Sequence, residues 1–149
     1  MIAVIQRVSQ AQVMVEGEVV AMIDKGLLIL LGVERGDGAR EIKYLADKIV
    51  NLRIFDNEEG KFDLSLADVE GSALIVSQFT LLGAWQKGRR PSYEAAAVPE
   101  IASPLVGQFV EEIQKLNIPT ETGIFGAHME VSLINDGPVT FTLDTAHLK

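Results

Sequence analysis

The segment from Leu27 to Val33 constrains the fold most, because every residue in it except Gly32 is apolar. A strand that is apolar on both faces lies in the middle of a sheet whose two faces are both covered. The sequence therefore predicts a layered domain built around this strand. The unbroken apolar run from Leu27 to Leu31 is also far too short to cross a bilayer, so we expect a soluble protein with no membrane partner.

The other periodicities predict a mixed α/β domain with seven or eight strands and two helices. Apolar residues alternate near both ends of the chain, which is typical of antiparallel hairpins, and recur at helical spacing in two central segments. We expect a mostly antiparallel, strongly curved sheet with both helices on one side. The expected strands are 2–15 with a bulge near 7–10, 19–23, 27–33, 52–55, 73–81, 129–133 and 139–143; the expected helices are 42–50 and one that begins at the Ser103-Pro104 cap and ends near Asn117.

Composition indicates one globular domain over residues 1–149. Apolar residues make up 48% of the chain and charged residues 23%, which is ordinary for such a domain. The lack of cysteine excludes a disulfide framework, a thiolate metal site and a cysteine nucleophile, and it suits a cytoplasmic location. His128 and His147 form no metal-binding pattern, so we expect no metal site and assign both histidines ordinary roles. The N-terminus carries no basic leader that would predict export.

The distribution of charge singles out one segment. The chain has 13 basic and 21 acidic residues, and its net charge of −8 should repel nucleic acid at long range. Residues 71–93 nevertheless contain no Asp or Glu, while Lys87, Arg89 and Arg90 give this segment a charge of +3. The segment is either an ordinary solvated loop or a local exception that can contact phosphates.

Uncharged polar residues interrupt the expected strand 73–81 near its end. In a strand, Ser77 and Phe79 would face one side, and Gln78 and Thr80 the other. Hydroxyl and amide groups at the end of a strand, beside a loop without acids, are suited to lining a polar pocket. The alternative is that they satisfy neighbouring backbone groups.

A second unusual segment is Gly137-Pro138, in the turn expected between strands 129–133 and 139–143. Proline is awkward in a tight hairpin because it cannot donate to the ladder. A cis bond would give a type VI turn and would point two successive carbonyls in nearly the same direction, forming an acceptor pair. Because cis X–Pro bonds are uncommon, the pattern alone favours the trans form.

Both segments resemble the signature motifs of the D-aminoacyl-tRNA deacylases. The motifs stand here as VSQFTL, starting at Val76, and NDGPVT, from Asn135 to Thr140. The segments MIAVIQRV, GLLILLGV, GRRPSY and TGIFGAHMEVSLINDGPVTF are also similar to that family. The resemblance runs from Met1 to about Leu143 without large gaps and leaves only the tail, residues 144–149, outside the family pattern.

The resemblance implies a homodimeric β/β/α pseudo-barrel that hydrolyses the ester between a D-amino acid and the terminal ribose of tRNA. It implies a site at the dimer interface, with the catalytic motif of one subunit facing a glycine–cis-proline pair of the other, and neither metal nor organic cofactor. The motif is Ser77, Gln78, Phe79 and Thr80, and the pair is Gly137 and Pro138. Such a pair would reject L-side chains by steric exclusion and would let glycine through.

Under this resemblance the basic segment gains a role, since Lys87, Arg89 and Arg90 become candidate contacts for phosphates at the CCA end of tRNA. Thr80 has no histidine or other base near it in sequence, so we expect it to position groups rather than to act as the nucleophile. Backbone N–H groups around Phe79 and the 2′-hydroxyl of the RNA are then expected to assist the reaction.

Two alternatives to an enzyme remain at this point. One is a non-catalytic, dimeric RNA-binding module that uses residues 77–90 as its surface. The other is a structural homodimer in which Gly137-Pro138 only shapes an interface.

Overall fold

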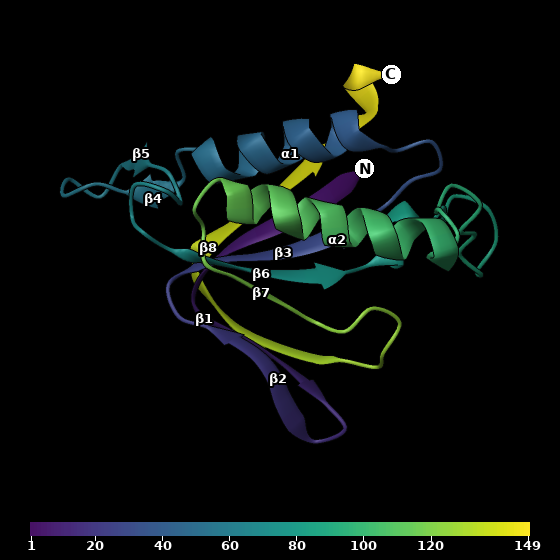
Figure 1. Cartoon of the computed structure of the whole chain (residues 1–149), viewed down its shortest axis with the longest axis horizontal. Helices are drawn as coiled ribbons and strands as arrows, with labels where there is room; N and C mark the ends of the chain where they lie inside the picture. The colour runs from purple at the N-terminus through teal and green to yellow at the C-terminus, as the bar shows by residue number, and fades with distance from the viewer.

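The computed structural model describes all residues 1–149, and its two α-helices lie on one side of a strongly curved sheet (Figure 1). Eight strands and two short 3-10 helices complete the chain. The strands are β1 (Ile2–Val15), β2 (Glu18–Ile23), β3 (Gly26–Gly32), β4 (Phe55–Asp56), β5 (Phe62–Leu64), β6 (Ser72–Ser77), β7 (Thr120–Thr122) and β8 (Glu130–Asp144); the helices are α1 (Ala39–Asn51), α2 (Pro99–Lys115), η1 (Phe79–Leu82) and η2 (Thr145–Leu148).

Strand β1 organises the sheet because it pairs with three others. Its first half pairs antiparallel with β3 and its second half with β2, while β8 runs antiparallel to both halves and so occupies the opposite edge. Strand β3 pairs parallel with β6, and β6 pairs parallel with β7. Strand β3 therefore lies inside the sheet and is buried at all but one residue, as its apolar run predicts.

Two apolar clusters separate the molecule into three layers. On one face of β3, Leu27 and Ile29 pack in the cluster that includes α1 and α2, whereas Leu28 on the other face packs with the second half of β1 and with β2. The register between β1 and β8 shifts twice between Gln6 and Gln10, and this bend folds β2 over the face of the sheet that the helices leave free. The expected β/β/α fold with both helices on one side is confirmed. No helix is long and apolar enough to span a membrane.

Helix α1 confirms its predicted apolar face, but the predicted start of α2 is wrong. Helix α2 begins at Pro99, five residues before Pro104, and Pro104 lies inside it. A proline at the first helical position gives up an N–H that has no partner there, and Pro99 follows this rule whereas Pro104 does not. Pro99 provides this start earlier in the chain, and Pro104 then leaves the carbonyl of Glu100 without its usual donor.

The expected hairpin near the C-terminus does not exist. Strand β8 runs through the predicted turn without reversing, because both of its halves pair with the long β1. Gln6 pairs with Thr140 and Val8 pairs with Asn135, so residues 136–139 of β8 stand opposite the single residue Arg7. The predicted turn is therefore a bulge, and Gly137-Pro138 lies in it as an exposed segment of a continuous strand.

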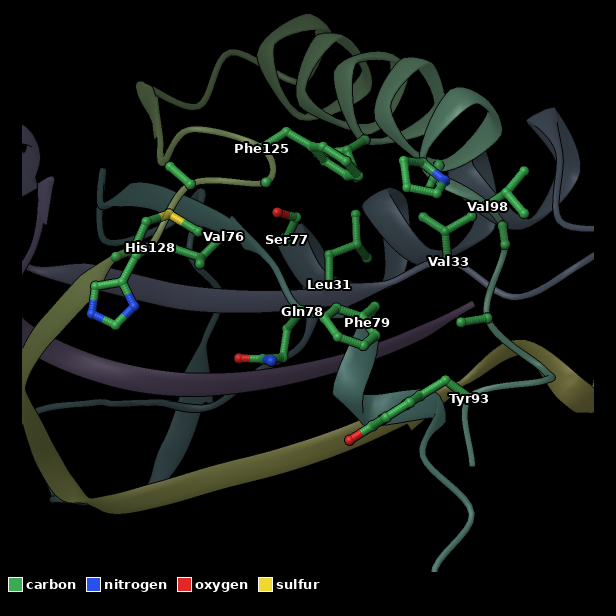
Figure 2. A pocket seen from close by; sticks show the side chains of 18 of the residues that line it. Leu31, Val33, Val76, Ser77, Gln78, Phe79, Tyr93, Val98, Phe125 and His128 are labelled. Atoms are coloured by element: carbon green, nitrogen blue, oxygen red, sulfur yellow. The ribbon is translucent and has the colours of Figure 1, made fainter. Parts of the chain in front are cut away.

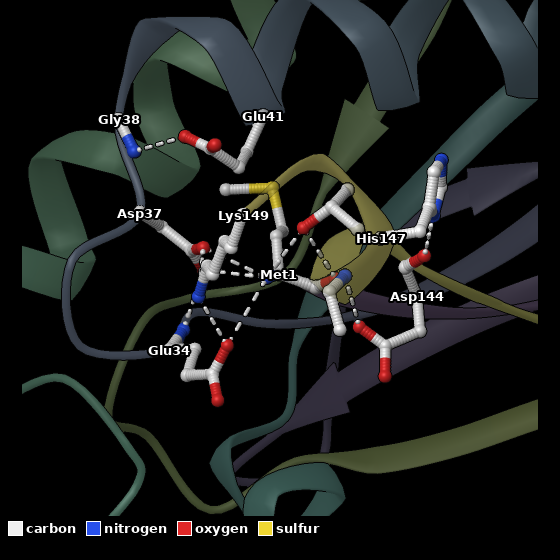
Figure 3. A network of polar contacts seen from close by, with 10 residues as sticks. Met1, Glu34, Asp37, Gly38, Glu41, Asp144, His147 and Lys149 are labelled. Atoms are coloured by element: carbon white, nitrogen blue, oxygen red, sulfur yellow. Dashed lines mark hydrogen bonds and ion pairs between the residues drawn. The ribbon is translucent and has the colours of Figure 1, made fainter.

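The tail, residues 144–149, folds back and helps to fix the loop between β3 and α1 (Figure 3). The buried α-ammonium of Met1 donates to Asp37 Oδ1 and Thr145 Oγ1, each at 2.8 Å. Lys149 pairs with Glu34 and lies 3.5 Å from Asp37 Oδ1; its hydrogen bond to Glu34 raises the pKa of the lysine. These contacts hold a loop whose neighbouring residues line the cleft described next.

Candidate active site

A cleft of about 620 Å³ opens where β3 and β6 end beneath the start of α2 (Figure 2). Its walls come from the end of β3, the end of β6, the segment 96–106 and the segment 125–131. Fourteen of its twenty lining residues are hydrophobic, so its few polar groups stand out. The loop held by the network of Figure 3 contributes Arg35, whose Nε donates to the carbonyl of Ala96 at 3.3 Å. This shape is suited to a small, mostly apolar group with a few polar atoms.

The motif Ser77 to Thr80 lies at one edge of this cleft, but it is not the end of a strand as predicted. Strand β6 ends at Ser77, and Phe79 begins the 3-10 helix η1. The backbone N–H of Gln78 donates the last hydrogen bond to β3, at 2.8 Å to the carbonyl of Leu31, and the chain turns after it. The alternation expected for a strand is therefore wrong beyond Ser77.

The turn gives each residue of the motif a distinct environment. Ser77 and Gln78 are half-buried and line the cleft, and Figure 2 shows the Ser77 hydroxyl pointing into it. Phe79 is 58% exposed and packs edge-to-face on Tyr93, with ring centroids 5.0 Å apart. Thr80 does not line the cleft; its Oγ1 accepts a hydrogen bond from the Gln78 amide. The first N–H groups of a short helix have no acceptor within it, so those of Phe79 and Thr80 can serve an outside oxygen.

The cleft holds no carboxylate, and its titratable side chains are Arg35, Tyr93 and His128. Sequence reasoning assigned His128 an ordinary role, but the structure places this exposed residue on the cleft wall (Figure 2). Its position follows from the loop before β8, which no local pattern reveals. No group of three or more His, Cys, Asp or Glu residues is arranged to hold a metal ion.

Gly137 and Pro138 lie outside this cleft, on the exposed bulge of β8. The peptide bond between them is cis. The Asn135 side chain spans the bulge: its Oδ1 accepts from the backbone N–H of Val139 at 2.8 Å, and its Nδ2 donates to Thr140 Oγ1 at 2.9 Å. Within one chain, the structure does not bring the two motifs together.

Sequence reasoning missed Arg7, which holds the bulge from below. This side chain is only 6% exposed; its Nε donates to the carbonyl of Asp136 at 2.8 Å, and its Nη1 donates to the carbonyl of Ile54 at 2.9 Å. Asp56 Oδ1 lies 3.3 Å from Nη1 and supplies the opposite charge. The signal was present in the sequence, because Arg7 is the only charged residue of the predicted strand 2–15 and lies at the predicted bulge.

Lys87, Arg89 and Arg90 lie on an exposed loop between Phe79 and Tyr93, two residues that line the cleft. Two backbone bonds between Ala84 and Ser92, at 2.7 and 2.8 Å, close the loop. None of the three cations forms an ion pair with a carboxylate of the chain. The loop ends at Tyr93 on the cleft wall. The three cations are therefore close to the cleft in sequence, but they do not line it.

Comparisons with known proteins agree over nearly the whole chain. Residues 4–144 match the family described as D-Tyr-tRNA(Tyr) deacylase. A D-aminoacyl-tRNA deacylase of Thermosipho africanus is 59% identical over 143 residues, with 96% of each chain covered. One of Chloroflexus aurantiacus is 60% identical over 147 residues, covering 99% of this chain and 92% of that protein.

Two solved structures share the fold. One, titled c-Myc DNA Unwinding Element Binding Protein, superposes with a TM-score of 0.92 at 40% identity and covers 97% of this chain and 99% of that one. The other, a probable eukaryotic D-amino acid tRNA deacylase, has a TM-score of 0.77 at 17% identity, with 95% and 97% covered. The second likeness concerns the fold alone.

Proposed function

The chain belongs to the D-Tyr-tRNA(Tyr) deacylase family, and we propose that it hydrolyses the ester of D-aminoacyl-tRNA to free D-amino acid and tRNA. The observation that carries this proposal is the apolar cleft edged by Ser77, Gln78 and Phe79, which contains no carboxylate. An aminoacyl ester is already activated, so a site that only orients groups and stabilises an oxyanion suffices for its hydrolysis.

The reaction needs one water molecule and no covalent enzyme intermediate. The water oxygen attacks the ester carbonyl carbon, and the resulting oxyanion accepts hydrogen bonds from the backbone N–H groups of Phe79 and Thr80. As the oxyanion collapses, the bond to the ribose oxygen breaks, and that oxygen leaves with the proton from the water. The neighbouring 2′-hydroxyl of the RNA relays this proton, since no basic side chain lies beside Thr80.

The site is completed by a second copy of the chain. The bulge of β8 is exposed, is held rigidly by Arg7 and Asn135, and lies away from the cleft of its own chain. In the dimer that we propose, Gly137 and Pro138 of one copy reach the Ser77–Thr80 motif of the other. Backbone carbonyls of the pair hold the substrate's α-ammonium group. With the ester carbonyl also fixed, two substituents of the chiral carbon are placed, and its handedness alone decides which of the two remaining positions the side chain takes.

Rejection of L-amino acids then follows from shape. With the ammonium and the ester fixed, an L-side chain would point into the Gly137-Pro138 segment, whereas a D-side chain points out of the site. Steric exclusion discriminates more strongly than attraction in an apolar pocket. Glycine has no side chain to exclude, so glycyl-tRNA is a second substrate.

A deacylation assay with purified protein tests the proposal against its alternatives. We expect release of D-tyrosine from D-tyrosyl-tRNA, release of glycine from glycyl-tRNA, and no turnover of L-tyrosyl-tRNA. A non-catalytic RNA-binding module would bind all three RNAs without turnover, and a structural homodimer would do neither. Equal hydrolysis of the D- and L-esters would support the proposed hydrolase activity but would overturn the steric mechanism of rejection.

A further inference from the structure

The loop beside the cleft carries a side chain that neither the fold nor the proposed reaction explains. Trp85 is 74% exposed, more than any other large apolar residue of the chain. It forms no aromatic pair and no cation–π contact within the chain. An indole ring combines a large apolar face with one N–H donor, so an exposed tryptophan is suited to contact a partner.

The surroundings of Trp85 define the charge of that partner. Its loop contains Lys87, Arg89 and Arg90, all exposed and unpaired, and residues 71–93 include no acid. The rest of the protein is acidic, so an anion is attracted to this loop and repelled elsewhere. An aromatic ring beside unpaired cations is the combination that binds single-stranded nucleic acid, with bases stacking on the ring and cations meeting phosphates.

The position of Trp85 relates this surface to the cleft. Gly83, two residues earlier, packs so closely on Tyr93 that an added Cβ would lie 3.1 Å from Tyr93 Cε1. Tyr93 in turn lines the cleft and contacts Phe79. Two residues of chain span at most about 7 Å, so the backbone of Trp85 lies within that distance of Gly83, which packs on the Tyr93 ring of the cleft wall.

We infer that Trp85 is a stacking platform for an unpaired base in the single-stranded 3′ end of the substrate tRNA, on the 5′ side of the terminal adenosine. This inference rests on the proposed function, which places the terminal adenosine and its ester in the cleft. We place the preceding nucleotides past Tyr93, which lines the cleft and directly follows this loop in the chain. Trp85 receives one of their bases, and the cations of its loop meet the adjoining phosphates.

Kinetics with two substrates isolate this contact. Trp85→Ala should lower kcat/KM on D-tyrosyl-tRNA about tenfold, mainly through KM, because one stacked base is lost. Trp85→Phe, which keeps an aromatic face, should retain most of the activity. On adenosine esterified with D-tyrosine, which has no preceding nucleotide, both variants should match the wild type.

Each other outcome of these kinetics has a definite meaning. Unchanged kcat/KM of Trp85→Ala on the tRNA would overturn the inference, and so would an equal loss on both substrates. Weaker subunit association of Trp85→Ala in sedimentation would place the ring against a second copy and would also overturn it. If the wild type hydrolyses neither ester, the proposed function fails, and the binding experiment below still tests the stacking contact.

Fluorescence provides that independent test, because Trp85 is the only tryptophan of the chain. Uncharged tRNA with its complete 3′ end should quench the emission of the wild-type protein through stacking. The same tRNA without its last three nucleotides should quench it much less. Equal quenching by the two RNAs, or none by either, would contradict a stacking contact with the 3′ end.

Discussion

At the scale of single residues, the Thr80 hydroxyl is a nucleophile candidate of the motif, yet its surroundings argue against that role. Its hydroxyl oxygen already accepts a hydrogen bond from the Gln78 amide, and it does not line the cleft. No carboxylate or imidazole is hydrogen-bonded to it to take its proton. A threonine hydroxyl without a base is a poor nucleophile at neutral pH.

We therefore predict that Thr80→Ala lowers kcat by less than about tenfold, whereas removing the 2′-hydroxyl of the terminal adenosine lowers it by about a hundredfold or more. Single-turnover hydrolysis of D-tyrosyl-tRNA with a ribose or a 2′-deoxyribose end measures both effects. Thr80→Ser, which keeps the hydroxyl, is the matched control. An inactive Thr80→Ala combined with full activity on the deoxy substrate would make Thr80 the nucleophile.

Glu41 is a second residue with a testable electrostatic role, because it caps the start of α1. Its carboxylate accepts the backbone N–H of Gly38 at 2.9 Å, and this bond holds the pKa of Glu41 below its ordinary value. A pKa that is lower in the folded than in the unfolded protein adds stability above the unfolded pKa. That stability is lost as the pH falls through the folded pKa.

Glu41→Gln should therefore lower the free energy of unfolding by about 1 kcal/mol or less at pH 7. The difference from wild type should shrink in acid, as the pH falls through the lowered pKa of Glu41 and the wild-type carboxylate takes up its proton. The Ser65 N–H also lowers the pKa of Asp68. Asp68 is present in both proteins, so its contribution to the pH dependence of stability cancels in the comparison. Urea unfolding at several pH values measures the difference; a difference independent of pH would show that packing, not charge, carries the effect.

At the scale of elements, the bulge of β8 shows what the sequence could and could not predict. The apolar run of β3 and the helical spacing in α1 are local signals, and both predictions are confirmed. The turn chemistry of Asn135 to Pro138 is equally local, but its outcome depends on β1, which lies more than a hundred residues away. Because β1 is long enough to pair with both halves of β8, the expected hairpin became a bulge.

The cleft illustrates the same limit. Its motif was visible in sequence, since Ser77 to Thr80 is polar where the strand should be apolar. Its other walls come from the start of α2 and from the loop that carries His128, segments that meet only after the chain folds. Arg7 was visible as the only charge of its strand, but only the folded chain shows that it binds the backbone of Asp136.

Asn135 allows the bulge to be loosened without altering Gly137-Pro138. Asn135→Ala removes the acceptor of the Val139 N–H and should cost about 1 kcal/mol of stability. Because the bulge loses its fixed shape, discrimination between D- and L-tyrosyl-tRNA should fall at the same time. Asn135→Asp keeps the acceptor oxygen and is expected to preserve most of the discrimination. If Asn135→Ala loses stability without any change in discrimination, the shape of the bulge does not contribute to the choice between D- and L-amino acids.

At the scale of the whole molecule, each chain presents the two motifs on separate surfaces. The cleft with Ser77 to Thr80 lies at the ends of β3 and β6, and the bulge projects from β8. Two copies related by a twofold axis would place each bulge against the other copy's cleft, so one interface would create two identical sites. We predict that the active species is a dimer, and light scattering at assay concentration measures it; an active monomer would contradict a shared site.

Subunit mixing tests this central claim most directly. Ser77→Phe fills the cleft of its own chain, and Gly137→Ala distorts the bulge, where an added Cβ would lie 2.6 Å from the Val139 nitrogen. Each variant alone should be folded, dimeric and inactive on D-tyrosyl-tRNA. Random mixing of the two should restore about a quarter of wild-type activity, because each mixed dimer regains one intact site. A mixture no more active than its separate components would contradict a site shared between subunits.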